Sequence, residues 1–129
     1  VLSADVNAAI DPDHQGVHDK HNAAVIGSGI CLTKYTGVRG KAGSSDAHAE
    51  FIGKIRTILN AAKAPWQTGE LGKVDEGGGG TVALFFARYG ADVLDAGPAL
   101  LAMHSPFELA HKDDVFSAYL CYKAFFAKA

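Results

Sequence analysis

Asp5 and His104 are the two residues whose type and position most directly suggest chemistry. Each follows a short apolar stretch with the composition of a strand, residues 1–2 and 99–103. Open α/β sheets bind ligands beyond the carboxyl ends of their strands, and a carboxylate and an imidazole are both ligands of zinc. The residues alone leave an alternative open, in which Asp5 is a turn or helix-cap residue and His104 a half-buried histidine.

His14, His18 and His21 form a second group. On a helix, this spacing would place three imidazoles on one side, where they could hold a metal. Pro12, Gly16 and the lack of apolar periodicity argue against a helix in this segment. We therefore expect three solvated histidines, preceded by a turn at residues 11–13.

The run Gly77–Gly80 is a third candidate, and it leads into Thr81 and the apolar residues 82–87. Bare glycine amides at the start of a helix could receive an anion, and a tight structural turn is the alternative. A P-loop is excluded because Gly40-Lys41 and Gly72-Lys73 are followed by alanine and valine instead of serine or threonine, and the spaced glycines of a dinucleotide-binding turn are missing. The Gly-x-Ser-x-Gly and His-Glu-x-x-His motifs are absent too, so serine hydrolases and zincins have no support.

The elements that must position these residues alternate between strands and helices. We expect strands at residues 1–5, 30–35, 65–68, 92–96 and 99–103, and helices at 45–62, at 82–87 and across the C-terminal segment behind residues 113–114. Residues 37–45 have the composition of a Gly/Ser loop. The alternation predicts right-handed βαβ crossovers and hence a three-layer αβα fold with a largely parallel sheet and helices on both faces.

Two of these helices carry further expectations. Residues 82–87 are apolar nearly all round, which predicts a buried helix, and Phe85→Ala is then expected to cost about 3–5 kcal/mol of stability. In the last helix Val115, Tyr119, Tyr122 and Phe126 stand at helical spacing and predict an amphipathic helix.

Length, charge and cysteine usage limit the classes of protein. A chain of 129 residues predicts one domain. The 12 Lys and Arg nearly balance the 14 Asp and Glu, so the chain has no excess positive charge that would attract nucleic acid or an anionic membrane. No apolar run is long enough for a membrane helix, and the start lacks the pattern of a signal peptide. We expect a cytoplasmic protein with neither nucleic acid nor membrane as a partner, in which Cys31 and Cys121 are reduced and buried.

Five ordered motifs together resemble one family. They are Ser3-Ala4-Asp5, residues 32–37 (LTKYTG), residues 40–47 (GKAGSSDA), residues 70–81 (ELGKVDEGGGGT) and residues 103–108 (MHSPFE). In this order they are similar to the C-terminal part of the bacterial branch of the aspartyl aminopeptidase family, metallopeptidase family eighteen. The resemblance covers essentially the whole chain.

The resemblance implies a metal-dependent exopeptidase that removes N-terminal residues from peptide substrates. Two zinc ions are expected in each complete active site, with cobalt or manganese as alternatives, and Asp5 and His104 match the family's metal ligands. Lys34, Tyr35, Gly78 and Gly79 are expected to line the substrate pocket. Residues 1–129 would form the C-terminal part of a zinc-exopeptidase-like catalytic domain, within a full-length enzyme that is a homo-oligomer.

The chain departs from the family in what it lacks. A further histidine, a bridging aspartate and a Glu-Glu pair that includes the general base belong to segments N-terminal to the Ser-Ala-Asp motif, and neither these nor the family's inserted domain is found in residues 1–129. We therefore assign no catalytic residue within this chain and expect the chain alone to be inactive. Two other functions stay open, a non-catalytic folding or oligomerisation module and an anion-binding domain built on the glycine run.

Overall fold

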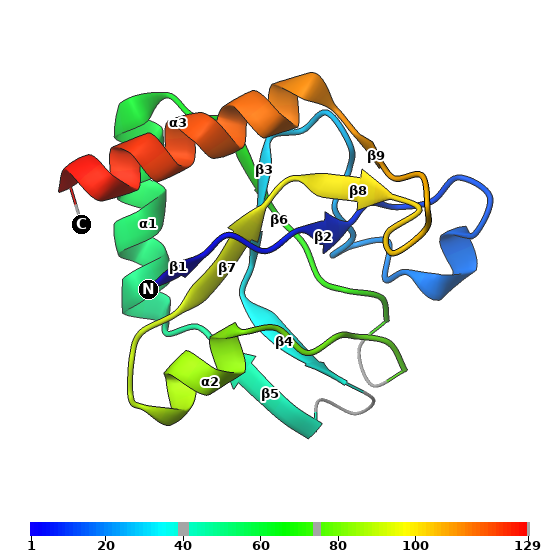
Figure 1. The fold of residues 1–129 in the computed structure, drawn as a ribbon, viewed down its shortest axis with the longest axis horizontal. Coiled ribbons are helices and arrows are strands. Elements are labelled where there is room, and N and C mark those ends of the chain that lie inside the picture. The colour runs from blue at the N-terminus through cyan, green and yellow to red at the C-terminus, as the bar shows by residue number, and fades with distance from the viewer. Residues whose placement is uncertain (39–41, 74–75, 129) are drawn as a thin grey trace.

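The computed structural model describes residues 1–38, 42–73 and 76–128, and Figure 1 shows how its elements are arranged. In chain order the elements are β1 (Leu2–Ser3), β2 (Asn7–Ala8), the 3-10 turn η1 (Gln15–Val17), β3 (Ile30–Thr33), β4 (Tyr35–Val38), β5 (Ala42–Asp46), α1 (Ala49–Ala62), β6 (Trp66–Thr68), α2 (Ala83–Arg88), β7 (Leu94–Gly97), β8 (Ala99–Leu101), β9 (Leu109–Ala110) and α3 (Lys112–Lys128).

The central sheet has four strands in the order β1-β7-β3-β6. The two outer pairings, β1 with β7 and β3 with β6, are parallel, while the central pairing of β3 with β7 is antiparallel. A second sheet continues from it in the order β2-β8-β9, with β2 and β8 parallel. The predicted α/β class is confirmed, and the sheet, expected to be largely parallel, has two parallel pairings and an antiparallel central one.

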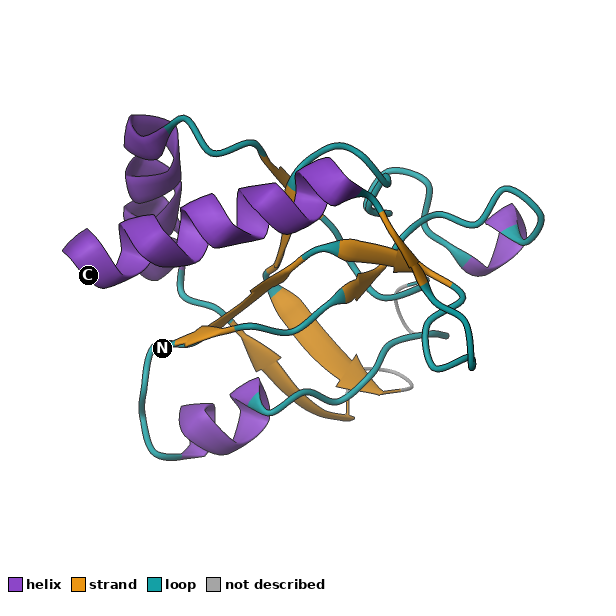
Figure 2. Cartoon of the chain, turned by 45° about the horizontal axis from the view of Figure 1, so that its top comes forward, coloured by secondary structure: helices purple, strands orange, loops and turns teal. Residues whose placement is uncertain are grey.

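One face of the central sheet carries the main apolar core. Ile30 and Leu32 of β3 and Leu94 and Ala96 of β7 alternate toward this face, because successive side chains of a strand point to opposite sides. Helices α1 and α3 both cover it, as Figure 2 shows. We expected helices on both faces of the sheet, but α1 and α3 lie on the same face. Loop and strand residues cover the opposite face through a smaller cluster of Ala9, Ala24, Cys31 and Ala99.

Helix α1 lies within its predicted range of 45–62, whereas the buried face of α3 differs from the predicted one. Ile55, Ile58 and Leu59 of α1 are buried. In α3, however, three of the four spaced apolar residues are exposed, with Phe126 at 86% and Val115 and Tyr119 above half. The small residues Ala118, Cys121 and Ala124 face the core instead. Because these side chains are small, α3 packs closely against the sheet and α1. The small residues of α3 are therefore buried, and most of its larger apolar residues are exposed.

The prediction of a buried second helix is wrong. Helix α2 has six residues, and Phe85 is 58% exposed, Phe86 41% and Tyr89, just after the helix, 91%. The helix lies beside the β4–β5 hairpin, away from the main core, and only Ala83 is buried. An all-round apolar pattern indicates that a helix lacks a polar face but not which neighbours cover it.

The segment expected as a Gly/Ser loop forms the β4–β5 hairpin. Tyr35 pairs with Asp46, Thr36 with Ser45, and Val38 with Ala42, with an irregularity between the last two pairs. Residues 39–41 of the expected loop lie outside the described residues. Backbone hydrogen bonds need no particular side chain, so a sequence of low strand propensity can still form a ladder when its partner lies opposite.

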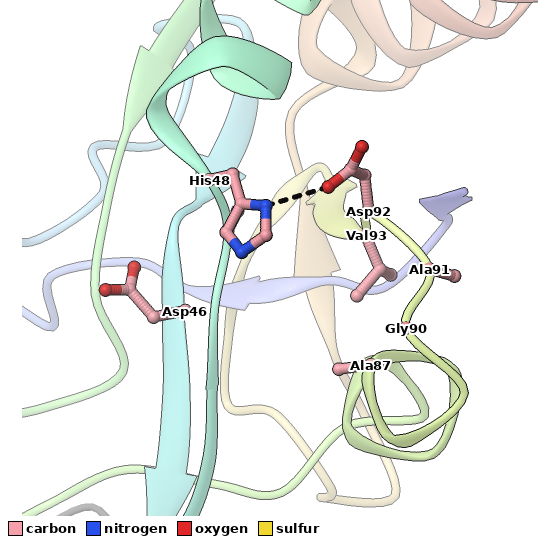
Figure 3. Close-up of a pocket in the computed structure, with 8 residues that line it drawn as sticks. Asp46, His48, Ala87, Gly90, Ala91, Asp92 and Val93 are labelled. Carbon is pink, nitrogen blue, oxygen red and sulfur yellow. Dashed lines mark ion pairs between the residues drawn. The ribbon is translucent and has the colours of Figure 1, made fainter.

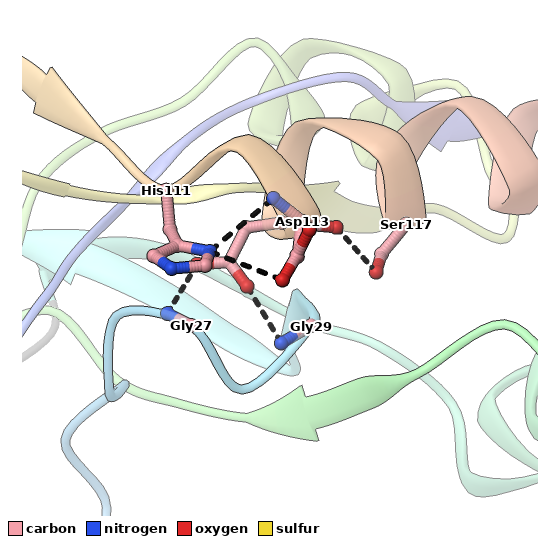
Figure 4. A network of polar contacts seen from close by, with 6 residues as sticks. Gly27, Gly29, His111, Asp113 and Ser117 are labelled. Carbon is pink, nitrogen blue, oxygen red and sulfur yellow. Dashed lines mark hydrogen bonds and ion pairs between the residues drawn. The ribbon is translucent and has the colours of Figure 1, made fainter.

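A buried carboxylate ties the start of α3 to the loop before β3. The two carboxylate oxygens of Asp114, which is fully buried, accept hydrogen bonds from the Gly27 and Gly29 amides, each at 2.7 Å. Figure 4 shows this network beside His111. Gly29 has a φ of +95°, and a Cβ there would stand 2.5 Å from the Pro65 carbonyl, so only glycine fits.

Candidate functional site

The face of the central sheet opposite the main core carries buried polar side chains beside the smaller apolar cluster. The strand register places Ser3 of β1 and Thr33 of β3 on either side of Asp95 in β7. Partners in register share a face of the sheet, so these three side chains form a row across three strands. All three are buried, with Asp95 only 3% exposed.

Asn7 of β2 joins this row. Its side-chain amide donates to Thr33 Oγ1 at 2.5 Å, and the residue is fully buried. Within the described residues, Asn7 Oδ1 and Asp95 Oδ1 are buried oxygens that accept no hydrogen bond. Ser3 Oγ also has no partner among the described residues. A buried polar group without a partner costs free energy, and three of them on one face distinguish this region from a purely structural core.

Burial raises the pKa of the Asp95 carboxyl above its usual range, because the charged form loses hydration. The hydroxyls of Ser3 and Thr81 act against this rise, and the nearby Asp5 adds to it. Thr81 Oγ1 donates to Asp95 Oδ2 at 2.7 Å. The Ser3 hydroxyl lies close to the carboxyl but completes no hydrogen bond with it in the described part of the chain.

Asp5, the first predicted ligand, lies between β1 and β2 and is half-buried. Its backbone is packed directly against β7, since a Cβ on Gly97 would stand 2.1 Å from the Asp5 carbonyl oxygen. Asp5 therefore follows the carboxyl end of β1 as predicted and stands next to the polar row.

His104, the second predicted ligand, lies in the exposed turn after β8. Its φ is +67°, and Ala102 two residues earlier has a φ of +55°, both in the left-handed region that side chains disfavour. The His104 amide donates to Glu108 Oε1 at 2.6 Å, and the Ser105 amide donates to the Ala102 carbonyl at 3.0 Å. A backbone held in a strained conformation by its own hydrogen bonds is typical of functional turns.

Asp5 and His104 lie outside the strands, on the segments that flank β2 and β8. Asp5 precedes β2 and His104 follows β8, and these strands pair in parallel, so Asp5 lies before the amino end of this ladder and His104 beyond its carboxyl end. In the described ranges, no group of three His, Cys, Asp or Glu side chains gathers to hold a metal. An aspartate oxygen and a histidine nitrogen are donors that zinc accepts, so they fit a partial donor set.

The predicted substrate-pocket residues fall in two places. Lys34 and Tyr35 follow β3, next to Thr33 of the polar row, and the Lys34 ammonium pairs with the Asp46 carboxylate of the hairpin. Gly78 and Gly79 lie in the turn before Thr81, with Gly78 at a φ of +114°. Both places thus adjoin the polar face, and the role in substrate binding stays a prediction.

The predictions for the other two candidates are partly corrected. His14 and His21 are exposed, as expected, but His18 is buried and its Nε2 accepts a hydrogen bond from the Asp11 amide at 3.4 Å. The predicted turn at residues 11–13 is confirmed, because Asp11 Oδ1 accepts from the Asp13 amide. The glycine run leads into a helix too short to offer a helix-terminus site for an anion.

Sequence reasoning missed Asp95 and Asn7 as members of the site. A signal existed for Asp95, an acidic residue in the middle of the apolar run 93–96, because a charged residue inside a buried strand needs a partner. Asn7 carried no such signal, since asparagine after a short strand is ordinary turn composition.

A separate cavity of about 250 Å³ lies between α1, α2 and the hairpin, and Figure 3 shows its lining. His48 Nδ1 contacts Asp92 Oδ1 at 2.9 Å, and both side chains are more than half exposed. Asp46 also lines this cavity but is turned away from His48. The cavity borders Val93, before the amino end of β7, and so lies at the other end of that strand from the close contact between Gly97 and Asp5.

A search of the described residues finds no helix able to span a membrane. Both cysteines are free and buried, which confirms the predicted reduced thiols.

The α/β architecture, with one potential zinc donor, Asp5, beside the polar row and a second, His104, in the turn after β8, is of the zinc-peptidase kind. A family model described as Aminopeptidase I zinc metalloprotease (M18) matches residues 1–126. The chain therefore belongs to the M18 family, in agreement with the motifs in its sequence.

Individual relatives agree with this assignment. The chain is 54% identical over 128 residues to a probable M18 family aminopeptidase 1 of Thermotoga maritima, covering 99% of this chain and 28% of that protein. The crystal structure of an M18 aminopeptidase from Thermotoga maritima matches with a TM-score of 0.95 and 53% identity, over 100% of this chain and 29% of that one. Aminopeptidase I from Clostridium acetobutylicum matches with a TM-score of 0.91 and 51% identity, over 96% and 27%. The chain thus spans less than a third of the length of these relatives.

Proposed function

We propose that this chain supplies part of the catalytic domain of a zinc aminopeptidase that hydrolyses N-terminal residues from peptides. The observation that carries the proposal is the family match across residues 1–126. The strained backbone of His104 and the half-buried Asp5 beside the polar face support it.

In this proposal, Asp5 contributes an anionic oxygen and His104 a neutral ring nitrogen to a site with two zinc ions, for which cobalt or manganese are alternatives. Bound zinc supplies Lewis acidity that polarises a peptide carbonyl and activates water. Lys34, Tyr35, Gly78 and Gly79 orient the peptide. The general base and the remaining ligands come from outside this chain, in keeping with the partial donor set described above.

The proposal is tested in a chimera of the Thermotoga maritima aminopeptidase in which this chain replaces the 128 matching residues. We expect release of acidic or neutral aminoacyl chromogenic groups that is lost on treatment with a chelator and restored by zinc, cobalt or manganese. A folded, metal-loaded chimera without such activity would contradict the proposal.

The 129-residue chain alone provides the matched negative case. With two potential ligands and no general base, it is expected to retain less than one zinc per chain after dialysis and to show no turnover above the buffer blank. Two tightly held zinc ions in elemental analysis, or metal-dependent turnover that survives repurification, would contradict the proposal that the general base and the remaining ligands come from outside this chain.

A second candidate function is assembly, with the chain as an oligomerisation module. It is favoured by the exposed aromatic side chains Phe85 and Tyr89 near α2 and Phe116 and Phe126 on α3, because large exposed apolar groups often mark protein contacts. A neighbour of the same fold, S. cerevisiae mApe1, is a dodecamer, with a TM-score of 0.73 and 22% identity over 98% of this chain and 26% of that one. Light scattering on the chimera distinguishes a homo-oligomer from a monomer.

A further inference from the structure

Strand β7 touches both segments to which the proposed function assigns a role. Asp95 and Gly97 are two residues apart and face the polar side of the sheet. Asp95 Oδ2 accepts the hydrogen bond from Thr81 Oγ1, at the end of the glycine run. Gly97 lies against the backbone of Asp5 so closely that no Cβ fits between them.

Thr81 joins the glycine run to α2. While its hydroxyl donates to Asp95, the hydroxyl oxygen accepts from the Ala83 amide at 3.3 Å, in the first turn of the helix. On the other side of Thr81, a Cβ on Gly80 would meet no atom within 4 Å, and one on Gly79 would meet only the tip of Leu71. Gly79 and Gly80 therefore have open space around them next to Thr81, whereas Gly77 at the other end of the run packs against Gly72. The bond from Thr81 to Asp95 joins the open end of the run to the sheet.

The position of Asp95 is costly for stability alone. A carboxyl that is 3% exposed loses its hydration, and the Thr81 hydroxyl is its one hydrogen-bonding side chain among the described residues. An apolar residue would suit the middle of a strand between Leu94 and Ala96 better. The group that this carboxyl does hold is the hydroxyl at the end of the glycine run.

We propose that Asp95 and Thr81 are positioning residues, which fix the glycine run 77–80 against β7 so that it lies beside the backbone of Asp5. The inference rests on the proposed function for its consequence in peptide binding. Neither residue touches the peptide: Asp95 acts through Thr81, and Thr81 acts through the backbone of the glycine run. Losing the bond should loosen the run and weaken peptide binding without removing a zinc ligand.

The first test uses this chain and needs no activity. Hydrogen exchange of the amides of residues 78–83 is compared for the unsubstituted chain, Thr81→Val and Thr81→Ser. Valine keeps the shape without the hydroxyl, and serine keeps the hydroxyl. We expect Thr81→Val to speed exchange in the run by about 10- to 100-fold, the factor for one hydrogen bond to a charged group, and Thr81→Ser to stay close to the original. Unchanged exchange in Thr81→Val would overturn the proposal.

The second test uses the chimera and separates positioning from mere folding. Thr81→Val is expected to raise KM by about 10-fold or more while kcat, zinc content and Tm change little, and Thr81→Ser should restore KM. Thr57→Val, the same change at an exposed threonine of α1, serves as the control. A loss of activity that only follows the unfolded fraction, or an equal loss in Thr81→Ser, would overturn the proposal.

A double-substitution cycle tests whether the two residues act together. If they form one unit, Asp95→Asn combined with Thr81→Val should raise KM no further than Thr81→Val alone. Fully additive effects on KM would contradict the pairing. An inactive unsubstituted chimera would overturn the proposed function instead, and the exchange measurement would still decide whether Thr81 holds the glycine run.

Discussion

The two faces of the central sheet differ in what their side chains do. One face is a closed apolar core in which Leu32 and Leu94 pack beneath α1 and α3. The other carries a row of buried polar groups, Ser3, Asp95 and Thr33. Among the described residues, Ser3 Oγ, Asp95 Oδ1 and the neighbouring Asn7 Oδ1 lack a hydrogen-bond partner. Alternation along β3 and β7 places both kinds of side chain on the same strands.

This difference indicates how stability and function are divided in the chain. Apolar burial stabilises the fold in proportion to the area removed from water, and the helical face supplies it. The polar face gives up part of that stabilisation, and the predicted ligand Asp5 lies beside it. Substitutions on the two faces should therefore separate changes in activity from changes in the free energy of unfolding.

The largest expected effect is on activity at the predicted ligands. In the chimera, Asp5→Ala and His104→Ala should each lower kcat/KM by more than about 100-fold, beyond the 10- to 100-fold typical of residues that only support ligands. The Tm should change little because neither side chain belongs to the core. Zinc content and circular dichroism melts are measured on the same samples. Full activity and full zinc in the His104 variant would refute its assignment as a ligand.

The apolar face should show the reverse pattern. Leu94→Ala, at a residue that is 1% exposed, is expected to lower the free energy of unfolding by about 2–5 kcal/mol through the cavity it leaves. Phe85→Ala is the control. Because Phe85 is 58% exposed, we expect the free energy of unfolding to change by no more than about 0.5 kcal/mol, instead of the large loss expected from the sequence. Urea denaturation of the chain measures both. Equal losses would mean that α2 packs against more of the chain than described above.

Glycine substitutions test the close contact between β7 and Asp5. Gly97→Ala should lower stability by about 1–3 kcal/mol, because the new Cβ overlaps the Asp5 carbonyl oxygen. Gly53→Ala, in the exposed face of α1 with no atom near the new Cβ, should raise stability by about 0.5–1 kcal/mol. Thermal melts compare the two. An unchanged Tm for Gly97→Ala would show that Asp5 is not held against β7.

A pH-dependent loss of stability is expected from titration of the buried thiols. Burial raises the pKa of Cys31 to about 12 and of Cys121 to about 11, above the ordinary value of 9.0. Since each pKa is raised in the folded state, the resulting stability is complete below pH 9 and declines as the pH rises toward these values. Unfolding free energy should fall gradually from pH 9 to 11. Both thiols should resist iodoacetamide at pH 8 until denaturant is added, and rapid labelling of the native chain would contradict their burial.

Local pattern was enough for part of the fold. A helix was predicted at 45–62, where α1 lies, and a strand at 30–35, where β3 lies, because periodicity and strand composition are properties of neighbouring residues. The motifs likewise identified the M18 family, and the family match agrees. Asp5 and His104 were selected from sequence, and their role as ligands stays a prediction.

Other features depended on contacts between distant segments. Whether Phe85 is buried depends on which elements cover α2, and α3 turned Ala118 and Cys121 inward because their small size permits close packing. The pairing of β4 with β5 used backbone groups that every residue carries.

The sequence by itself determined the kind of protein, the positions of the main helices and strands and the residues that could bind metal, since these follow from residue type and short-range spacing. Only the tertiary structure decided that Asp95 meets Thr81 and that Gly97 meets Asp5. The residues of the first pair are 14 positions apart in the chain, and those of the second, Asp5 and Gly97, are 92 positions apart. The pairing of β1 with β7 brings Asp5 to Gly97, and the position of the segment before α2 against β7 brings Thr81 to Asp95. Strand register is set by the pairing of whole strands rather than by the side chains that it places in contact.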